Sequence, residues 1–252
     1  MELPTAKLAY LLRMGDNALI LGQRLSEWCG HGPILEQDIA ITNIALDLMG
    51  QARTIFGQVA ELEGKGRSED ELAFLRYERE YRNVLLVEQP NEDFAHTIVR
   101  QFLFDAFHYP FYEALLESRD ETMVALAGKA IKEVTYHLRY SSEWMIRLGD
   151  GTEVSHQKMQ DALDHLWAFS GELYTPDALD EQLAAAGIGV DLEVLKAKYL
   201  AKVSDILAQA TLRQPESEWM QAGGKQGRHT ESMGYILAEM QYMQRAYPGL
   251  EW

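Results

Sequence analysis

The chain has 252 residues, of which 47% are hydrophobic and 25% charged, a composition typical of a globular protein with a sizeable core. Its 39 acidic and 23 basic residues give a formal net charge of −16. This charge argues against nucleic acid and against an anionic membrane surface as partners, because both require a basic protein face.

The N-terminus and the cysteine content favour the cytoplasm. Residues 1–10 lack the basic region and apolar run of a signal peptide, and no stretch approaches eighteen uncharged apolar residues. Cys29 is the single cysteine, so it cannot form an internal disulfide, which fits a reducing compartment. We expect Cys29 to pack as a small hydrophobe, in a cytoplasmic protein that does not span a membrane.

Helical periodicity dominates the first half of the chain, and strand signals are nearly absent. Apolar residues at three- and four-residue steps predict a helix over 5–28, which the glycines and proline of 29–33 should end. A second helix is predicted over 34–62. Its expected buried stripe consists of Ile41, Ile44, Leu48, Ile55 and Val59. Residues 65–92 are rich in charge and tyrosine and should form short helices and a loop.

The second half of the chain continues the helical pattern. Asp93 is placed to cap a third helix that reaches residue 118, in which Pro110 removes one backbone donor and predicts a kink. A fourth helix is predicted over 121–148. Weaker patterns predict a helix over 154–174, short helices to 212 and a last helix over 230–245.

Four long helices joined by short turns indicate an all-α fold built on a four-helix bundle with additional C-terminal helices. The bundle core should span about 5–148, and an appended helical layer about 153–252. No low-complexity tract or Gly/Ser linker separates the two parts. We therefore expect a single domain over 1–252.

Three residues on the long helices have the identity of dimetal-oxygenase ligands. They are Glu27, Asp105 and His137. In a ferritin-like bundle, each half of the metal site takes one carboxylate from one helix and a Glu-x-x-His pair from the next. The i, i+3 spacing puts both members of the pair on one helical face.

The positions that should complete the two pairs hold other residue types. One pair reads Leu48 and Gln51, and the other reads Val134 and His137. Iron and manganese need carboxylate oxygen or imidazole nitrogen, and a hydrocarbon side chain offers no lone pair. The sequence therefore predicts a bundle that has lost its metal, with no catalytic residues and no cofactor of its own.

The sequence allows two interpretations of the remaining polar residues. Buried Glu27, Asp105 and His137 would need a mutual hydrogen-bond and charge network, joined by a basic residue that the sequence does not identify. Alternatively, a mono- or dimetal oxidoreductase site could use Asp105, His108, Glu133 and His137.

A glycine-rich, basic segment precedes the last predicted helix. It contains Gly223, Gly224, Lys225, Arg228 and His229. Backbone amides at the start of that helix could receive an anion. A mobile connecting loop is the simpler interpretation, and contact with a partner or with the phosphate of an acyl-CoA is the alternative.

Short segments in order along nearly the whole chain resemble the C-subunit family of bacterial phenylacetyl-CoA 1,2-epoxidases. They are GDN at 15–17, SEWCGH at 26–31, LDLMGQAR at 46–53, LVEQPN at 86–91, KEVTYHLR at 132–139, GGK at 223–225, HTE at 229–231, LAEMQ at 237–241 and PGLEW at 248–252.

This resemblance implies a structural, non-catalytic subunit of a multicomponent oxygenase that epoxidises the ring of phenylacetyl-CoA in aerobic phenylacetate degradation. A homologous catalytic subunit would carry the diiron centre. A reductase with FAD and an iron–sulfur cluster would supply electrons, and further oxygenase subunits are implied partners. A homodimer of the isolated chain and an acyl-CoA-binding helical module stay open as alternatives.

Overall fold

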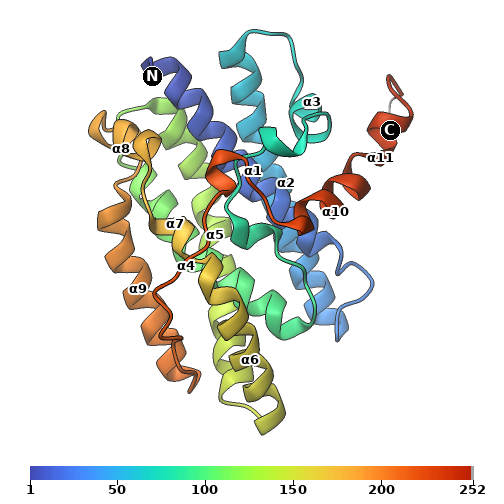
Figure 1. Ribbon diagram of the computed structural model, residues 1–252, viewed down its shortest axis with the longest axis vertical. Coiled ribbons are helices and arrows are strands. Elements are labelled where there is room, and N and C mark those ends of the chain that lie inside the picture. Colours follow the sequence, from blue (N-terminus) through green and yellow to red (C-terminus); the bar gives the residue numbers. More distant parts are fainter. Residues whose placement is uncertain (251–252) are drawn as a thin grey trace. The chain divides into compact units, whose positions relative to one another are not determined.

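The computed structural model describes residues 1–250, so Glu251 and Trp252 of the PGLEW segment lie outside the described residues. Every regular element within 1–250 is a helix, which confirms the all-α class (Figure 1). The chain forms two compact units. Unit 1 combines residues 1–90 with the segment from 223 onward, and unit 2 consists of residues 91–222.

Unit 1 is built around two long antiparallel helices. Its elements are α1 (Leu3–Ser26), α2 (Leu35–Glu63), α3 (Glu69–Phe74), η1 (Glu78–Glu80), η2 (Leu85–Glu88), η4 (Gly224–Gln226), α10 (Glu231–Met240) and α11 (Tyr242–Ala246). Gly15 lies against Phe56, and Gly22 lies against Leu48, so α1 and α2 run in opposite directions at close range.

The predicted apolar stripe of α2 is confirmed as core. All five of its residues are buried. Gly64 ends the helix with a φ of 65°, a left-handed conformation that glycine adopts without steric cost. The short helices expected between 65 and 92 are present as α3, η1 and η2.

The C-terminal segment packs on unit 1 through hydrogen bonds to the chain that follows α3. Gln241 Nε2 donates to the Arg76 carbonyl at 2.8 Å and to Tyr81 Oη at 2.9 Å. The guanidinium of Arg76 forms a buried ion pair with Asp16 of α1. The predicted layer over 153–252 is thus divided, since its last part belongs with residues 1–90. A single domain over 1–252 stays a prediction.

Unit 2 surrounds a central helix. Its elements are α4 (Phe94–Leu115), α5 (Glu121–Gly149), α6 (Glu153–Leu166), η3 (Trp167–Phe169), α7 (Gly171–Tyr174), α8 (Ala178–Ala185) and α9 (Leu192–Gln209). Helix α4 packs against α5, α6 and α9, and Asp93 caps it as predicted, accepting a hydrogen bond from His96 N at 3.0 Å. The helix runs through Pro110 without a break.

Three details differ from the sequence prediction, and one is that the helix predicted over 154–174 is divided into α6, η3 and α7. Cys29 is exposed, because α1 ends at Ser26 and the cysteine lies in the following turn. The predicted last helix over 230–245 is two helices, α10 and α11. None of the helices within 1–250 has both the length and the hydropathy that a bilayer crossing requires.

Candidate metal-binding positions and their surroundings

The metal-like positions of unit 1 do not form a half-site. Leu48 and Gln51 are buried on α2, and Gly22 of α1 lies against Leu48. Glu27 lies five positions further along, roughly 7.5 Å at the rise of an α-helix. Glu27 follows the last residue of α1, and its carboxylate pairs with Arg24 at 2.8 Å. The alignment of Glu27 with Leu48 and Gln51 is therefore not supported.

The positions of unit 2 do come together. Asp105 on α4 and His137 on α5 are both buried and interact electrostatically. Asp105 Oδ1 accepts a hydrogen bond from Gln101 Nε2 at 2.7 Å, and Oδ2 accepts one from Ser141 Oγ at 2.7 Å. Val134 is buried one turn before His137. A polar network therefore occupies this part of the α4–α5 pair.

Burial shifts the pKa values of Asp105 and His108 in opposite directions. It raises the pKa of Asp105 to about 7, although His137, Ser141 and Gln101 act in the other direction. Burial also lowers the pKa of His108 to about 3, and the nearby His137 adds to that effect. Both side chains are thus favoured in their neutral forms, as expected where water is excluded.

These residues do not fit a dimetal centre. Val134 offers no donor atom, and both oxygens of Asp105 already accept hydrogen bonds from Gln101 and Ser141. Across residues 1–250, no three or more His, Cys, Asp or Glu side chains form a group able to hold a metal ion, and this includes the alternative set with His108 and Glu133. The absence of a metal in the native chain stays a prediction.

Two members of the Asp105 network were missed from the sequence, although their spacing carried a signal. Gln101 precedes Asp105 by one helical turn, and Ser141 follows His137 by one turn. Positions i and i+4 share a helical face, so both could have been placed beside the ligand-like residues. The sequence alone does not show that Ser141 reaches across to α4.

The glycine-rich segment is packed rather than loosely exposed. Gly224, Lys225 and Gly227 are buried, while Arg228 is exposed. Gly227 has a φ of 76°, and a Cβ there would clash with the Arg82 guanidinium. The preferred interpretation as a mobile connecting loop thus disagrees with the close packing of these glycines.

The anion expected at the start of the last helix comes from the chain itself. Glu88 Oε1 accepts a hydrogen bond from Thr230 N at 2.6 Å, and Glu88 Oε2 lies 2.8 Å from His229 Nδ1. Thr230 is the residue that precedes α10. Because the Glu88 carboxylate already fills this position, the backbone at Thr230 does not provide an open phosphate site.

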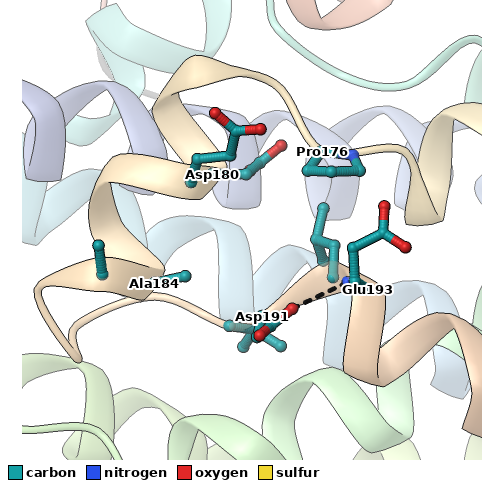
Figure 2. Close-up of a pocket in the computed structure, with 9 residues that line it drawn as sticks. Pro176, Asp180, Ala184, Asp191 and Glu193 are labelled. Carbon is teal, nitrogen blue, oxygen red and sulfur yellow. Dashed lines mark hydrogen bonds between the residues drawn. The ribbon is translucent and has the colours of Figure 1, made fainter.

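An acidic surface cavity of about 400 Å³ opens between α8 and α9 of unit 2 (Figure 2). Asp191 Oδ1 accepts a hydrogen bond from Glu193 N at 3.0 Å, and Asp180 Oδ2 accepts one from Asp177 N at 3.1 Å. Both carboxylates therefore stabilise helix starts. The cavity lining contains no histidine, lysine, serine or cysteine that could complete a catalytic arrangement.

Comparison with known proteins identifies the family. A profile described as phenylacetic acid catabolic protein matches residues 2–252. The chain is also 53% identical, over 244 residues, to a protein of Escherichia coli (strain K12) that is named as the C subunit of 1,2-phenylacetyl-CoA epoxidase. That match covers 97% of this chain and 98% of the relative. The all-helical structure agrees with the ferritin-like fold of this family. The chain therefore belongs to the phenylacetic acid catabolic protein family.

Proposed function

We propose that this chain is a structural, non-catalytic subunit of a cytoplasmic, multicomponent oxygenase that epoxidises the aromatic ring of phenylacetyl-CoA. The relative from Escherichia coli is named as one subunit of such an epoxidase, which supports assembly with other chains. The partners would be a homologous subunit that carries a diiron centre, further oxygenase subunits, and a reductase with FAD and an iron–sulfur cluster.

One observation carries the non-catalytic part of this proposal. Where a metal ligand pair would begin on α5, the side chain is that of Val134, and Asp105 of α4 is held by Gln101 and Ser141. These contacts satisfy the carboxylate without an ion, which removes the usual reason for a buried acid to recruit one. The role left for such a bundle is to support the helices of a partner.

The proposal can be tested by metal analysis together with assembly. The chain is expressed alone in iron-supplemented medium, purified, and its iron content measured. It is then mixed with the catalytic subunit, and complex formation and epoxidation of phenylacetyl-CoA are followed. We expect far less than one iron per isolated chain, no turnover by that chain, and restored turnover in the complex.

An Asp105→Asn variant makes this test sharper. If the chain is structural, the variant complex should epoxidise at a rate within about twofold of the wild type, because asparagine can keep the hydrogen bond from Ser141. Stoichiometric iron in the isolated wild-type chain, with oxygen-dependent turnover that Asp105→Asn abolishes, would overturn the proposal. Omission of the chain from the mixture serves as the control for background activity.

A further inference from the structure

Two histidines of unit 2 lie beside each other, where the start of α4 meets the end of α6. His96 is in the first turn of α4, and His165 is in the last turn of α6. Their ring centroids are 5.6 Å apart, with an angle of 66° between the ring planes. The network around Asp105 lies further along α4, so this histidine pair is a separate feature of the unit.

The surroundings of His96 determine which of its ring nitrogens is free. Burial acts to raise the pKa of Asp93, but the hydrogen bonds from His96 outweigh it and lower the pKa, so the side chain is a carboxylate near pH 7. Asp93 Oδ1 lies 2.9 Å from His96 Nδ1. A carboxylate only accepts hydrogen bonds, so Nδ1 carries the proton and Nε2 of the neutral ring keeps its lone pair. Within residues 1–250, Nε2 has no hydrogen-bond partner and is accessible to solvent.

The second histidine is exposed and leaves its nitrogens free. Within residues 1–250, the His165 ring contacts His96 and Phe169 but takes part in no hydrogen bond or ion pair. Asp161 precedes His165 by one turn on the same helical face, which adds negative charge near the pair. The other oxygen of Asp93 lies 3.4 Å from Lys158 Nζ, so both oxygens of that carboxylate are engaged.

The separation of the two rings suits imidazoles that bind one metal ion. A Zn–N bond of roughly 2.0–2.1 Å puts the ion about 3.2 Å from each ring centroid, and a tetrahedral angle then separates the centroids by about 5.2 Å. A small rotation of the exposed His165 ring reaches this value from 5.6 Å. Imidazole suits Zn²⁺, Cu²⁺ and Ni²⁺, whereas Mg²⁺ and Ca²⁺ require oxygen ligands. A carboxylate on the other nitrogen, as at His96, is the usual support of a metal-binding histidine.

We propose that His96 and His165 bind one divalent transition-metal ion of the Zn²⁺ or Cu²⁺ class. Nε2 of His96 and one nitrogen of His165 are the protein ligands, and Asp93 is the positioning residue for His96. Since no group of three such ligand side chains occurs within residues 1–250, water fills the other positions around the ion. Fe²⁺ binds nitrogen ligands more weakly than Cu²⁺ does, so the pair is not an iron centre. This site is independent of the proposed role in an epoxidase.

The test uses the full, metal-free chain and a calorimetric titration with Zn²⁺ at about pH 7.5. We expect saturation at one ion per chain, which excess Mg²⁺ does not prevent. His165→Ala should weaken binding at least about tenfold, because one of two imidazole ligands is lost. The variant should fold normally, since His165 is exposed and makes no hydrogen bond. The double variant Cys29→Ala/His31→Ala removes two exposed side chains of another turn and is the matched control, with unchanged affinity.

One further variant and a spectrum complete the test. Asp93→Asn keeps the cap of α4 but removes the charge behind His96, and it should weaken Zn²⁺ binding by about tenfold without changing the stability of the metal-free chain. Electron paramagnetic resonance of the Cu²⁺-loaded chain should show two imidazole nitrogens in the wild type and one in His165→Ala. No saturable binding by the wild type, unchanged affinity of His165→Ala, or an equal loss in the Cys29→Ala/His31→Ala control would overturn the proposal.

Discussion

The Glu88 carboxylate and the His229 imidazole form a buried pair, with 2.8 Å between Oε2 and Nδ1 and no exposed surface on either side chain. Glu88 Oε1 also accepts a hydrogen bond from Thr230 N, and Asn83 Nδ2 donates to Oε2 at 3.0 Å. A buried carboxylate with three donors is well compensated for lost hydration. The pair therefore attaches the start of α10 to the segment that ends at η2.

Glu88→Gln should weaken this attachment. The glutamine amide carries no charge. In the wild type, the Thr230 N–H and the His229 ring both donate to carboxylate oxygens of Glu88. In the variant, the NH₂ group would replace one of these oxygens, so two donors would face each other. We expect a loss of about 3 kcal/mol in the free energy of unfolding, because one partner of a buried ion pair is removed. Urea unfolding at about pH 6 measures the change. A loss below about 1 kcal/mol would contradict the expected contribution of the pair.

The same pair predicts a dependence on pH. Burial acts to lower the pKa of His229, but the hydrogen bond and charge of Glu88 outweigh it and raise the pKa above the ordinary 6.5. The stabilisation is therefore fully present below about pH 6.5 and is lost as the pH rises through the folded-state pKa. The stability difference between wild type and His229→Asn should shrink between about pH 6 and 9. His31→Asn, at an exposed histidine, is the control.

Asp105 predicts a second loss of stability with rising pH, which has a different physical cause. Its folded-state pKa, raised by burial to about 7, lies above the ordinary 3.8, so the folded chain holds a proton that the unfolded chain releases. Its contribution is greatest below about pH 3.8 and is lost as the pH rises towards 7. Asp105→Asn should remove this dependence, and the variant should be at least as stable as wild type at about pH 8.

The Asp105→Asn variant is expected to keep its hydrogen bonds. Gln101 Oε1 has no hydrogen-bond partner among the described residues, so the Gln101 amide can rotate to accept from the new NH₂ group. Denaturant unfolding at about pH 5 and pH 8 checks the prediction. A variant that loses more stability at the higher pH would show that Asp105 is needed as an anion.

Val134→Glu would restore the residue type of a metal ligand pair on α5. In the absence of a fitting metal site, the new carboxylate should be an uncompensated buried charge, because Val134 is buried. We expect a loss of about 3 kcal/mol or more at pH 8, a smaller loss at about pH 5, and iron far below one per chain. Val134→Thr, of similar volume but uncharged, is the control. Tight iron binding by the variant would contradict this expectation.

Two glycine substitutions separate helix packing from helix propensity. A Cβ at Gly15 of α1 would lie 2.5 Å from Phe56 Cε1, whereas a Cβ at Gly57 of α2 would meet nothing within 4 Å. Gly15→Ala should destabilise the chain by about 1–3 kcal/mol through overpacking. Gly57→Ala should stabilise it by about 0.5–1 kcal/mol, because alanine favours a helix. Thermal unfolding of both variants measures the contrast.

The sequence by itself determined the class of fold and the positions of the four long helices, because local features govern both. The stripe from Ile41 to Val59 follows the 3.6-residue repeat of the backbone, and Asp93 caps α4 through an amide three residues away. The sequence was also sufficient to show that Leu48 and Val134 are not metal ligands, since a hydrocarbon side chain cannot bind a metal in any fold. These conclusions needed no knowledge of distant neighbours.

Only the tertiary structure decided which side chains meet. Glu88 and His229 are separated by 141 positions, and no local pattern pairs them. The packing of Gly22 against Leu48 depends on how far α1 slides along α2, so Glu27 could not be placed by counting residues. Burial then raised the pKa of Asp105, because the desolvation cost of a carboxylate depends on every helix that excludes water from it.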